Sequence, residues 1–398
     1  MFTAFAGLGG TAAIIPALLP GLVSAGDEKF LAAVPALFGG LLVGVITSAF
    51  ALTTVDPLRL VGIGAAIQAL MLGSAVASQS NAGAFVVASA GAGVGFGLTE
   101  AAGSVAAKRS APGATPRALN ALTATVAAAA ALSPLVVFST PGDGRLGLLV
   151  VIFVHAAAAI LAFTARRPHA KHEVAYSQGA LESSSSRIPV SGRHLATVAA
   201  LGAAIALYVG VETIFAGGSA IIPARLLGLD ATTAALGTSV FWLLMALGRS
   251  LAAVVLRRLA PHYLAGTTAA IAATALGVAA LSAESAPVAA VAMCCVAVIV
   301  IAPTYSLIIG IAVDLLPPGA TARAIGPLVA CGALGGVLVP TAALGVAEPG
   351  APGGAFALAA ALCVPIGGIT VHLARRARAQ LPARVTCSSG EDGRPAAQ

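Results

Sequence analysis

The sequence predicts an all-α integral membrane protein whose twelve transmembrane helices form two similar six-helix halves. Hydrophobic residues make up 59% of the 398 residues and charged residues only 9%, whereas about a quarter of the residues in a soluble domain are charged. The apolar stretches are about 20 residues long or longer, which is enough to cross the hydrocarbon core as helices. The sequence lacks the short alternating segments that are typical of membrane β-barrels.

Internal repeats predict the division into halves. The segment GGTAAIIPALLPGL at 9–22 is matched by GGSAIIPARLLGL at 217–229, and PGATPRALNALTA at 112–124 is matched by PGATARAIGPLVA at 318–330. The aligned prolines of these two pairs are 207 and 206 residues apart. Two matches at nearly one offset indicate parallel tandem repeats, an arrangement found in many membrane carriers, whose substrate site lies between the halves.

The first half contains six apolar stretches separated by polar connections such as GDEK and TPGDGR. Lipid requires every backbone polar group to be bonded inside a helix, so each stretch is predicted as one span. In chain order the predicted spans cover 3–24, 30–53, 58–78, 82–107, 117–139 and 146–165.

The second half repeats this pattern after a segment of different composition. In chain order its predicted spans cover 195–222, 231–257, 262–283, 287–314, 321–346 and 354–375. The segment 166–194 is polar, Ser-rich and without apolar periodicity, which favours a mobile cytoplasmic linker between halves at 1–165 and 195–380. We expect residues 381–398 to form a disordered cytoplasmic tail for the same reason.

The distribution of basic residues predicts the orientation. Of the 21 Lys and Arg residues, only Lys29, Arg145 and Arg225 belong to one set of connections, Arg249 lies inside a span, and the other seventeen belong to the opposite set. Positive charge collects on the cytoplasmic side, so the linker and both termini are predicted to be cytoplasmic, in a cell (inner or plasma) membrane. The net charge of +7 therefore indicates topology, and no nucleic-acid partner is expected.

Catalytic and cofactor-binding patterns are missing from the sequence. It contains no GxxxxGK[ST] loop of an ATP-driven motor, no GxSxG, no HExxH and no CxxC. We therefore expect no enzymatic activity, no cofactor and no metal site. The expected partners are the lipid bilayer, protons and a small-molecule substrate, bound by a monomer.

Two of the 14 acidic residues lie well inside predicted spans, which makes them candidates for function because a charge inside the bilayer is costly. Glu100 lies in the fourth span among five glycines, which allow neighbouring helices to approach closely. Such an acid faces protein or a water-filled cavity and can exchange a proton. The functional interpretation is proton coupling, and the alternative is a structural hydrogen bond.

The second intramembrane acid is Glu212 in the seventh span. Tyr208 precedes it by four residues and so shares its helical face. A phenol and a carboxylate one turn apart suit a polyhydroxylated ligand or proton coupling, and the alternative is a Tyr–Glu bond that only fixes helices. Asn120 and Tyr305 are further candidates for substrate contact, although either side chain also suits interhelical packing. Gln68, His155, Thr304 and Trp242 are weaker candidates.

Arg249 lies about two turns inside the eighth span, deeper than Arg257 and Arg258. Its depth favours a structural ion pair or a gate over a topology signal. Asp314, at the cytoplasmic end of the tenth span, is a candidate partner in the same half, although nothing in the sequence fixes that pairing.

The tandem halves, the long linker and the run GRSLAAVVLRRLAP at 248–261 resemble the major facilitator superfamily. GFGLTEAAGSVAAKR at 95–109, YVGVETIFAGG at 208–218 and RALN at 117–120 resemble its fucose–proton symporter and glucose permease branch. The resemblance implies a proton-linked role for Glu100 and a sugar contact for Asn120.

The sequence also departs from that branch. The first span has no acid, alanines replace many polar residues, and the loop signature after the second span is reduced to TTVDPLRL, which keeps Asp56 and Arg59 as gating or structural residues. We expect a secondary active transporter of a sugar-like solute, proton-coupled and working by alternating access. The alternatives are proton-driven efflux of a drug or apolar metabolite, and a membrane sensor or scaffold that does not transport.

Overall fold

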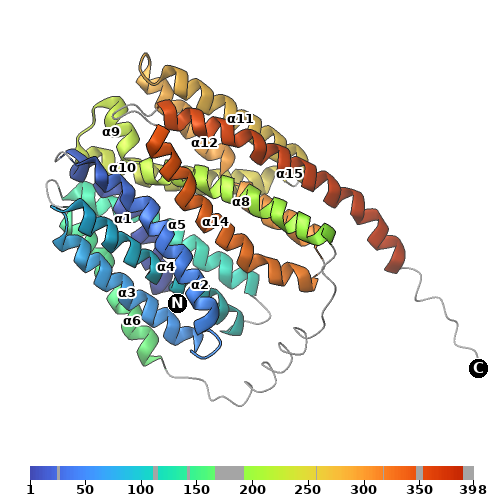
Figure 1. Ribbon diagram of the computed structural model, residues 1–398, viewed down its shortest axis with the longest axis horizontal. Coiled ribbons are helices and arrows are strands. Elements are labelled where there is room, and N and C mark those ends of the chain that lie inside the picture. The colour runs from blue at the N-terminus through green and yellow to red at the C-terminus, as the bar shows by residue number, and fades with distance from the viewer. Residues whose placement is uncertain are drawn as a thin grey trace, which may run out of the picture.

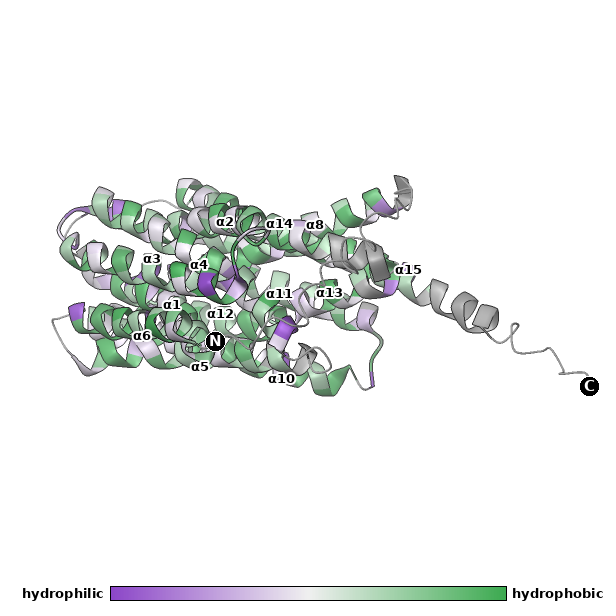
Figure 2. Ribbon diagram, turned by 90° about the horizontal axis from the view of Figure 1, so that it is seen from below, coloured by the Kyte–Doolittle hydropathy of each residue, from purple (hydrophilic) through white to green (hydrophobic). Residues whose placement is uncertain are grey.

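The computed structural model describes residues 1–24, 27–110, 115–140, 144–165, 192–256, 258–316, 318–346 and 353–388, and every regular element in them is a helix. Twelve helical segments of this described part are long and apolar enough to cross a membrane. Apolar residues cover most of the helices, and hydrophilic residues are few (Figure 2). The predicted fold class is therefore confirmed.

Six spans make up the first half. They are formed by α1 (Phe2–Ser24), the short helix η1 (Glu28–Ala32) with α2 (Ala33–Ala51), α3 (Pro57–Ala77), α4 (Ala82–Ser110), α5 (Thr115–Ser139) and α6 (Arg145–Thr164). Figure 1 shows these helices on one side of the molecule. Helix starts follow their local sequence: the Asp56 carboxylate accepts hydrogen bonds from the backbone N–H groups of Leu58 and Arg59 at 3.0 and 3.3 Å, directly before α3.

The second half contains six further spans, on the other side in Figure 1. They are formed by α8 (Gly192–Gly218), α10 (Ala231–Val255), α11 (Pro261–Ser282), α12 (Pro287–Ile301) with α13 (Thr304–Leu315), α14 (Pro318–Val346) and α15 (Gly353–Ser388). The short helix α9 (Ile221–Leu227) connects α8 to α10. The domain boundaries at 165, 194 and 380 stay predictions. Near them, α8 begins at Gly192 and α15 continues to Ser388.

Two of the helix pairs that join the halves are related to each other by the internal repeat. Helix α2 packs against α14, and α5 packs against α10. In the repeat, α2 corresponds to α10 and α5 to α14, so each pair is the counterpart of the other. This arrangement is expected for parallel repeats related by an axis along the membrane normal.

Glycines allow α2 and α4 to pack with their backbones in contact. A Cβ at Gly40 or Gly44 of α2 would overlap the backbone carbonyl of Ala90 or Val94, and a Cβ at Gly93 of α4 would overlap that of Leu37. Both helices carry glycines four residues apart, a pattern typical of close helix association in membranes. This packing fixes the position of α4, which carries Glu100.

Two of the predicted spans are interrupted. The seventh ends at Gly218, and α9 follows after a two-residue turn, although the matching segment of the first half continues as helix α1 through Pro16 and Pro20. The tenth is divided into α12 and α13 at Ala302–Pro303. Proline has no N–H to continue the helical ladder, which accounts for the second interruption.

Candidate functional site between the two halves

An ion pair links α8 to α10 inside the second half. The Arg249 guanidinium donates to the Glu212 carboxylate, with 3.4 Å between Nη2 and Oε1. The Glu212 side chain is 18% exposed and that of Arg249 is 34% exposed. Because both charges keep some access to solvent, a polar ligand or a proton can reach them.

The break between α12 and α13 lies against this ion pair. The Ala302 carbonyl oxygen accepts one hydrogen bond from the Tyr208 hydroxyl and one from Arg249 Nε, both at 3.4 Å. A helix break in the membrane is tolerated where other groups satisfy the released backbone atoms. The Tyr208 hydroxyl also interacts with Glu212 and Arg249. The four groups therefore form one connected polar cluster.

Tyr305 extends the cluster towards the first half. Its ring centroid lies 6.4 Å from that of Tyr208, and its phenol interacts electrostatically with Glu212, Arg249 and also Glu100. Glu100 comes from α4 of the other half and is half-buried. We define the central cluster as Glu100, Tyr208, Glu212, Arg249, Ala302 and Tyr305.

Most of the sequence-predicted site residues thus come together, from three elements of the second half and one of the first. The side chain of Asn120 in α5 lies outside the described part of the chain. Asp314 is exposed near the end of α13, and Arg249 pairs with Glu212 instead. Asp56 caps α3, and Arg59 contributes a backbone N–H to that cap while its side chain is exposed.

Neither the role of the Ala302 carbonyl nor the partner of Arg249 is predicted by the sequence. The proline that follows Ala302 is visible inside a long apolar stretch and signals a helix break. No sequence pattern shows that this break faces Tyr208 and Arg249, since the pairing depends on how α8, α10 and α12 pack.

A second polar group lies within the first half. The Thr11 hydroxyl donates to Gln68 Oε1 at 3.2 Å and lies 2.8 Å from His155 Nε2, and Gln68 Nε2 donates to the Thr99 hydroxyl at 3.3 Å. All four side chains are fully buried. They connect α1, α3, α4 and α6, so the described hydrogen bonds of Gln68 and His155 lie within the first half and hold its helices together.

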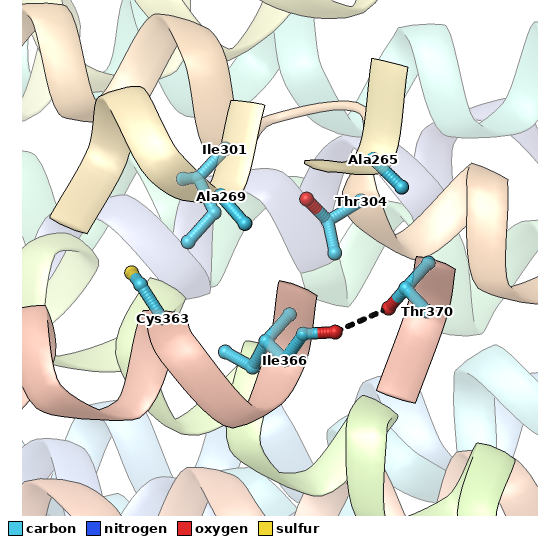
Figure 3. Close-up of a pocket in the computed structure, with 7 residues that line it drawn as sticks. All are labelled: Ala265, Ala269, Ile301, Thr304, Cys363, Ile366 and Thr370. Carbon is cyan, nitrogen blue, oxygen red and sulfur yellow. Dashed lines mark hydrogen bonds between the residues drawn. The ribbon is translucent and has the colours of Figure 1, made fainter. Parts of the chain in front are cut away.

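A small cavity is present elsewhere, between α11, α12, α13 and α15. Its lining is mostly apolar, and its two threonines come from different helices, Thr304 from α13 and Thr370 from α15 (Figure 3). The Thr370 hydroxyl donates to the Ile366 carbonyl within its own helix, 2.6 Å away. The lining contains no charged side chain, so this cavity offers less chemistry than the central cluster.

Comparisons with known proteins agree with the fold. A family model described as Major Facilitator Superfamily matches residues 1–340. A D-xylose–proton symporter is similar in structure, with 14% identity, coverage of 94% of this chain and 95% of that chain, and a TM-score of 0.73. The xylose transporter XylE from E. coli, in an inward open conformation, has 12% identity, coverage of 93% and 94%, and a TM-score of 0.68.

The fucose–proton symporter FucP in the outward conformation has 16% identity to this chain, coverage of 94% of this chain and 98% of its own, and a TM-score of 0.60. At these identities the likeness to solved structures shows the fold alone. No curated protein matched the sequence.

Proposed function

The chain belongs to the Major Facilitator Superfamily, a family of membrane transporters and not of enzymes, and from this premise we propose that it is a proton-coupled carrier of a small polar organic solute. Its two halves would rock around a central site by alternating access.

The central cluster carries the proposal because its charges do not balance. It holds two carboxylates, Glu100 and Glu212, and one guanidinium, Arg249. Arg249 compensates Glu212 through their ion pair, whereas no described group lies within hydrogen-bond or ion-pair distance of the Glu100 carboxylate. An uncompensated charge inside a membrane protein is costly. Glu100 is therefore the group that we assign to proton binding.

The remaining groups of the cluster suit a hydroxyl-bearing substrate. The phenols of Tyr208 and Tyr305 donate and accept hydrogen bonds, and Glu212 with Arg249 offers a paired acceptor and donor. We assign these residues to substrate contact, with Glu212 also linked to coupling. We also assign Asn120 to substrate contact, only because RALN at 117–120 resembles the fucose–proton symporter branch. The similarity to xylose and fucose symporters makes sugars the first substrate class to test.

The orientation follows from the basic residues. We propose that both termini and the segment 166–194 are cytoplasmic, that the protein lies in the cell membrane, and that it works as a monomer. We refer below to the side of Met1 and of the ends of α6 and α15 as the terminal side, and to the side of η1 and α9 as the opposite side.

A direct test is transport by purified protein in liposomes with an imposed pH gradient. We expect uptake of at least one labelled sugar from a panel of pentoses and hexoses, and we expect its collapse when a protonophore removes the gradient. Uptake at the same rate with and without the pH gradient would reject proton coupling. A panel of fluorescent dyes in inverted vesicles tests the alternative, proton-driven export of apolar compounds, which the many alanines of the sequence favour.

A further inference from the structure

One ion pair joins the two halves on the opposite side. Arg225 Nη2 lies 2.7 Å from Glu28 Oε1, although the two residues are 197 positions apart. Glu28 opens η1, which connects α1 to α2, and Arg225 lies in α9, which connects α8 to α10. These connections are counterparts in the internal repeat, so the pair joins equivalent points of the two halves.

Both charges are held by short, well-defined helices. The Asp27 carboxylate accepts a hydrogen bond from the Lys29 backbone N–H at 3.0 Å and so caps η1. Gly228 ends α9 with a φ of 64°, a left-handed conformation that favours glycine. Directly after α9, Asp230 caps α10, and its hydrogen bonds with Thr233 and Thr232 lower its pKa.

Apolar packing between the halves accompanies the ion pair on the same side. Val34 of α2 packs against Gly217 of α8, where an added Cβ would come within 2.9 Å of the valine side chain. Ala235 of α10 is fully buried in an apolar cluster of the first half that includes Leu18 and Val34. The opposite side is thus closed between the halves.

The face of α10 that carries Ala235 is open towards the terminal side. Ala246 and Ala253 follow Ala235 by 11 and 18 residues, which are about three and five turns, so the three residues lie on one face of the helix. Ala235 is buried, whereas Ala246 and Ala253 are exposed. The first half therefore covers this face only near the opposite side.

We propose that Glu28 and Arg225 form a latch that stabilises the state closed on the opposite side. This inference rests on the proposed function, because rocking of the halves would separate η1 from α9 and break the pair when that side opens. Exposed ion pairs are weak, so removing one partner should change the ratio of the two states by up to about fivefold. A latch of that strength biases the cycle without arresting it.

The first test measures opening without any substrate. The parent protein for this test has its five cysteines replaced by alanine. A single new cysteine, Ala235→Cys, then reports on access from the opposite side. We expect Glu28→Gln and Arg225→Gln each to accelerate labelling by a membrane-impermeant maleimide about two- to fivefold, and Glu28→Arg with Arg225→Glu to restore the slow rate. Lys29→Gln, on the same short helix, is the matched control and should leave the rate unchanged.

Labelling rates that stay equal in the parent, Glu28→Gln and Arg225→Gln proteins would overturn the latch. If Ala235→Cys prevents folding, Val34→Cys provides the same reporter from α2. This measurement needs neither a substrate nor a proton gradient, so a failure of the latch is distinguishable from a failure of the proposed function.

A second test uses Glu28→Cys with Arg225→Cys in the same background. We expect a thiol-to-thiol cross-linker of about 8 Å to block sugar transport, and a cleavable version to restore transport after reduction. Full cross-linking with unchanged transport would contradict the separation of η1 and α9 during the cycle.

Discussion

At the scale of single residues, the central cluster combines acids that lie far apart in the sequence. Glu100 and Glu212 stand out as the two acidic residues well inside apolar spans, and Tyr208 is recognisable by its spacing from Glu212. Arg249 is recognisable by its depth, but its partner is not, because Glu212 and Asp314 are both acids of the same half. Only the packing of α8 against α10 selects Glu212.

Arg249 provides a residue-scale prediction. Arg249→Gln leaves Glu212 without its counter-charge and removes a donor to the Ala302 carbonyl. We expect loss of transport and a stability decrease of about 1–3 kcal/mol, less than for a fully buried pair because both side chains keep solvent contact. Thermal unfolding in detergent and transport assays measure the two effects.

The double variant Glu212→Gln with Arg249→Gln is the control for this prediction. It removes both charges, so it should regain most of the lost stability while staying inactive. A single Arg249→Gln protein as stable and as active as the parent would contradict the assigned ion pair.

Gln68 provides a contrasting prediction. Gln68→Leu leaves Thr11 and Thr99 without their amide partner, which should lower stability by about 1 kcal/mol. None of the described hydrogen bonds in this group reaches Glu100, so the pH dependence of transport should stay unchanged. A shifted pH profile at normal stability would instead place Gln68 in the coupling machinery.

At the scale of elements, hydropathy predicts the spans well because lipid demands continuous helices. The interruptions of the seventh and tenth spans are harder to predict from the sequence. Pro16 and Pro223 occupy matching positions of the repeat, yet α1 continues through Pro16 while the chain turns between α8 and α9. A local pattern cannot separate these outcomes, since they depend on what each helix packs against.

The contact between α2 and α4 gives an element-scale prediction. Gly93→Val would force α4 away from the Leu37 carbonyl, and overpacking of this kind costs about 1–3 kcal/mol or more. We expect poor expression and early thermal unfolding. Gly73→Val in α3 is the matched control, because no atom lies within 4 Å of the added Cβ. Equal stability of the two variants would argue against the close backbone contact.

At the scale of the whole molecule, the two halves are similar in scaffold and different in chemistry. The repeat predicts equivalent helices, and the α2–α14 and α5–α10 contacts between the halves obey it, whereas α1 also packs against α10. The groups of the central cluster do not follow the repeat. The Glu212–Arg249 ion pair and the two tyrosines belong to the second half, and Glu100 belongs to the first. Sequence could place these residues in spans, but their meeting point depends on the packing of the halves.

In the proposed transport cycle Glu100 carries the coupled proton, and transport by a Glu100 variant provides the sharpest test of this assignment. Glu100→Gln keeps the size and polarity of the side chain, as in the protonated acid, but cannot exchange a proton. In proteoliposomes we predict that this variant loses accumulation driven by a pH gradient and keeps exchange of labelled for unlabelled substrate, while Glu284→Gln, a change at an exposed acid, behaves like the parent. Gradient-driven accumulation by Glu100→Gln at the parent rate would contradict the claim.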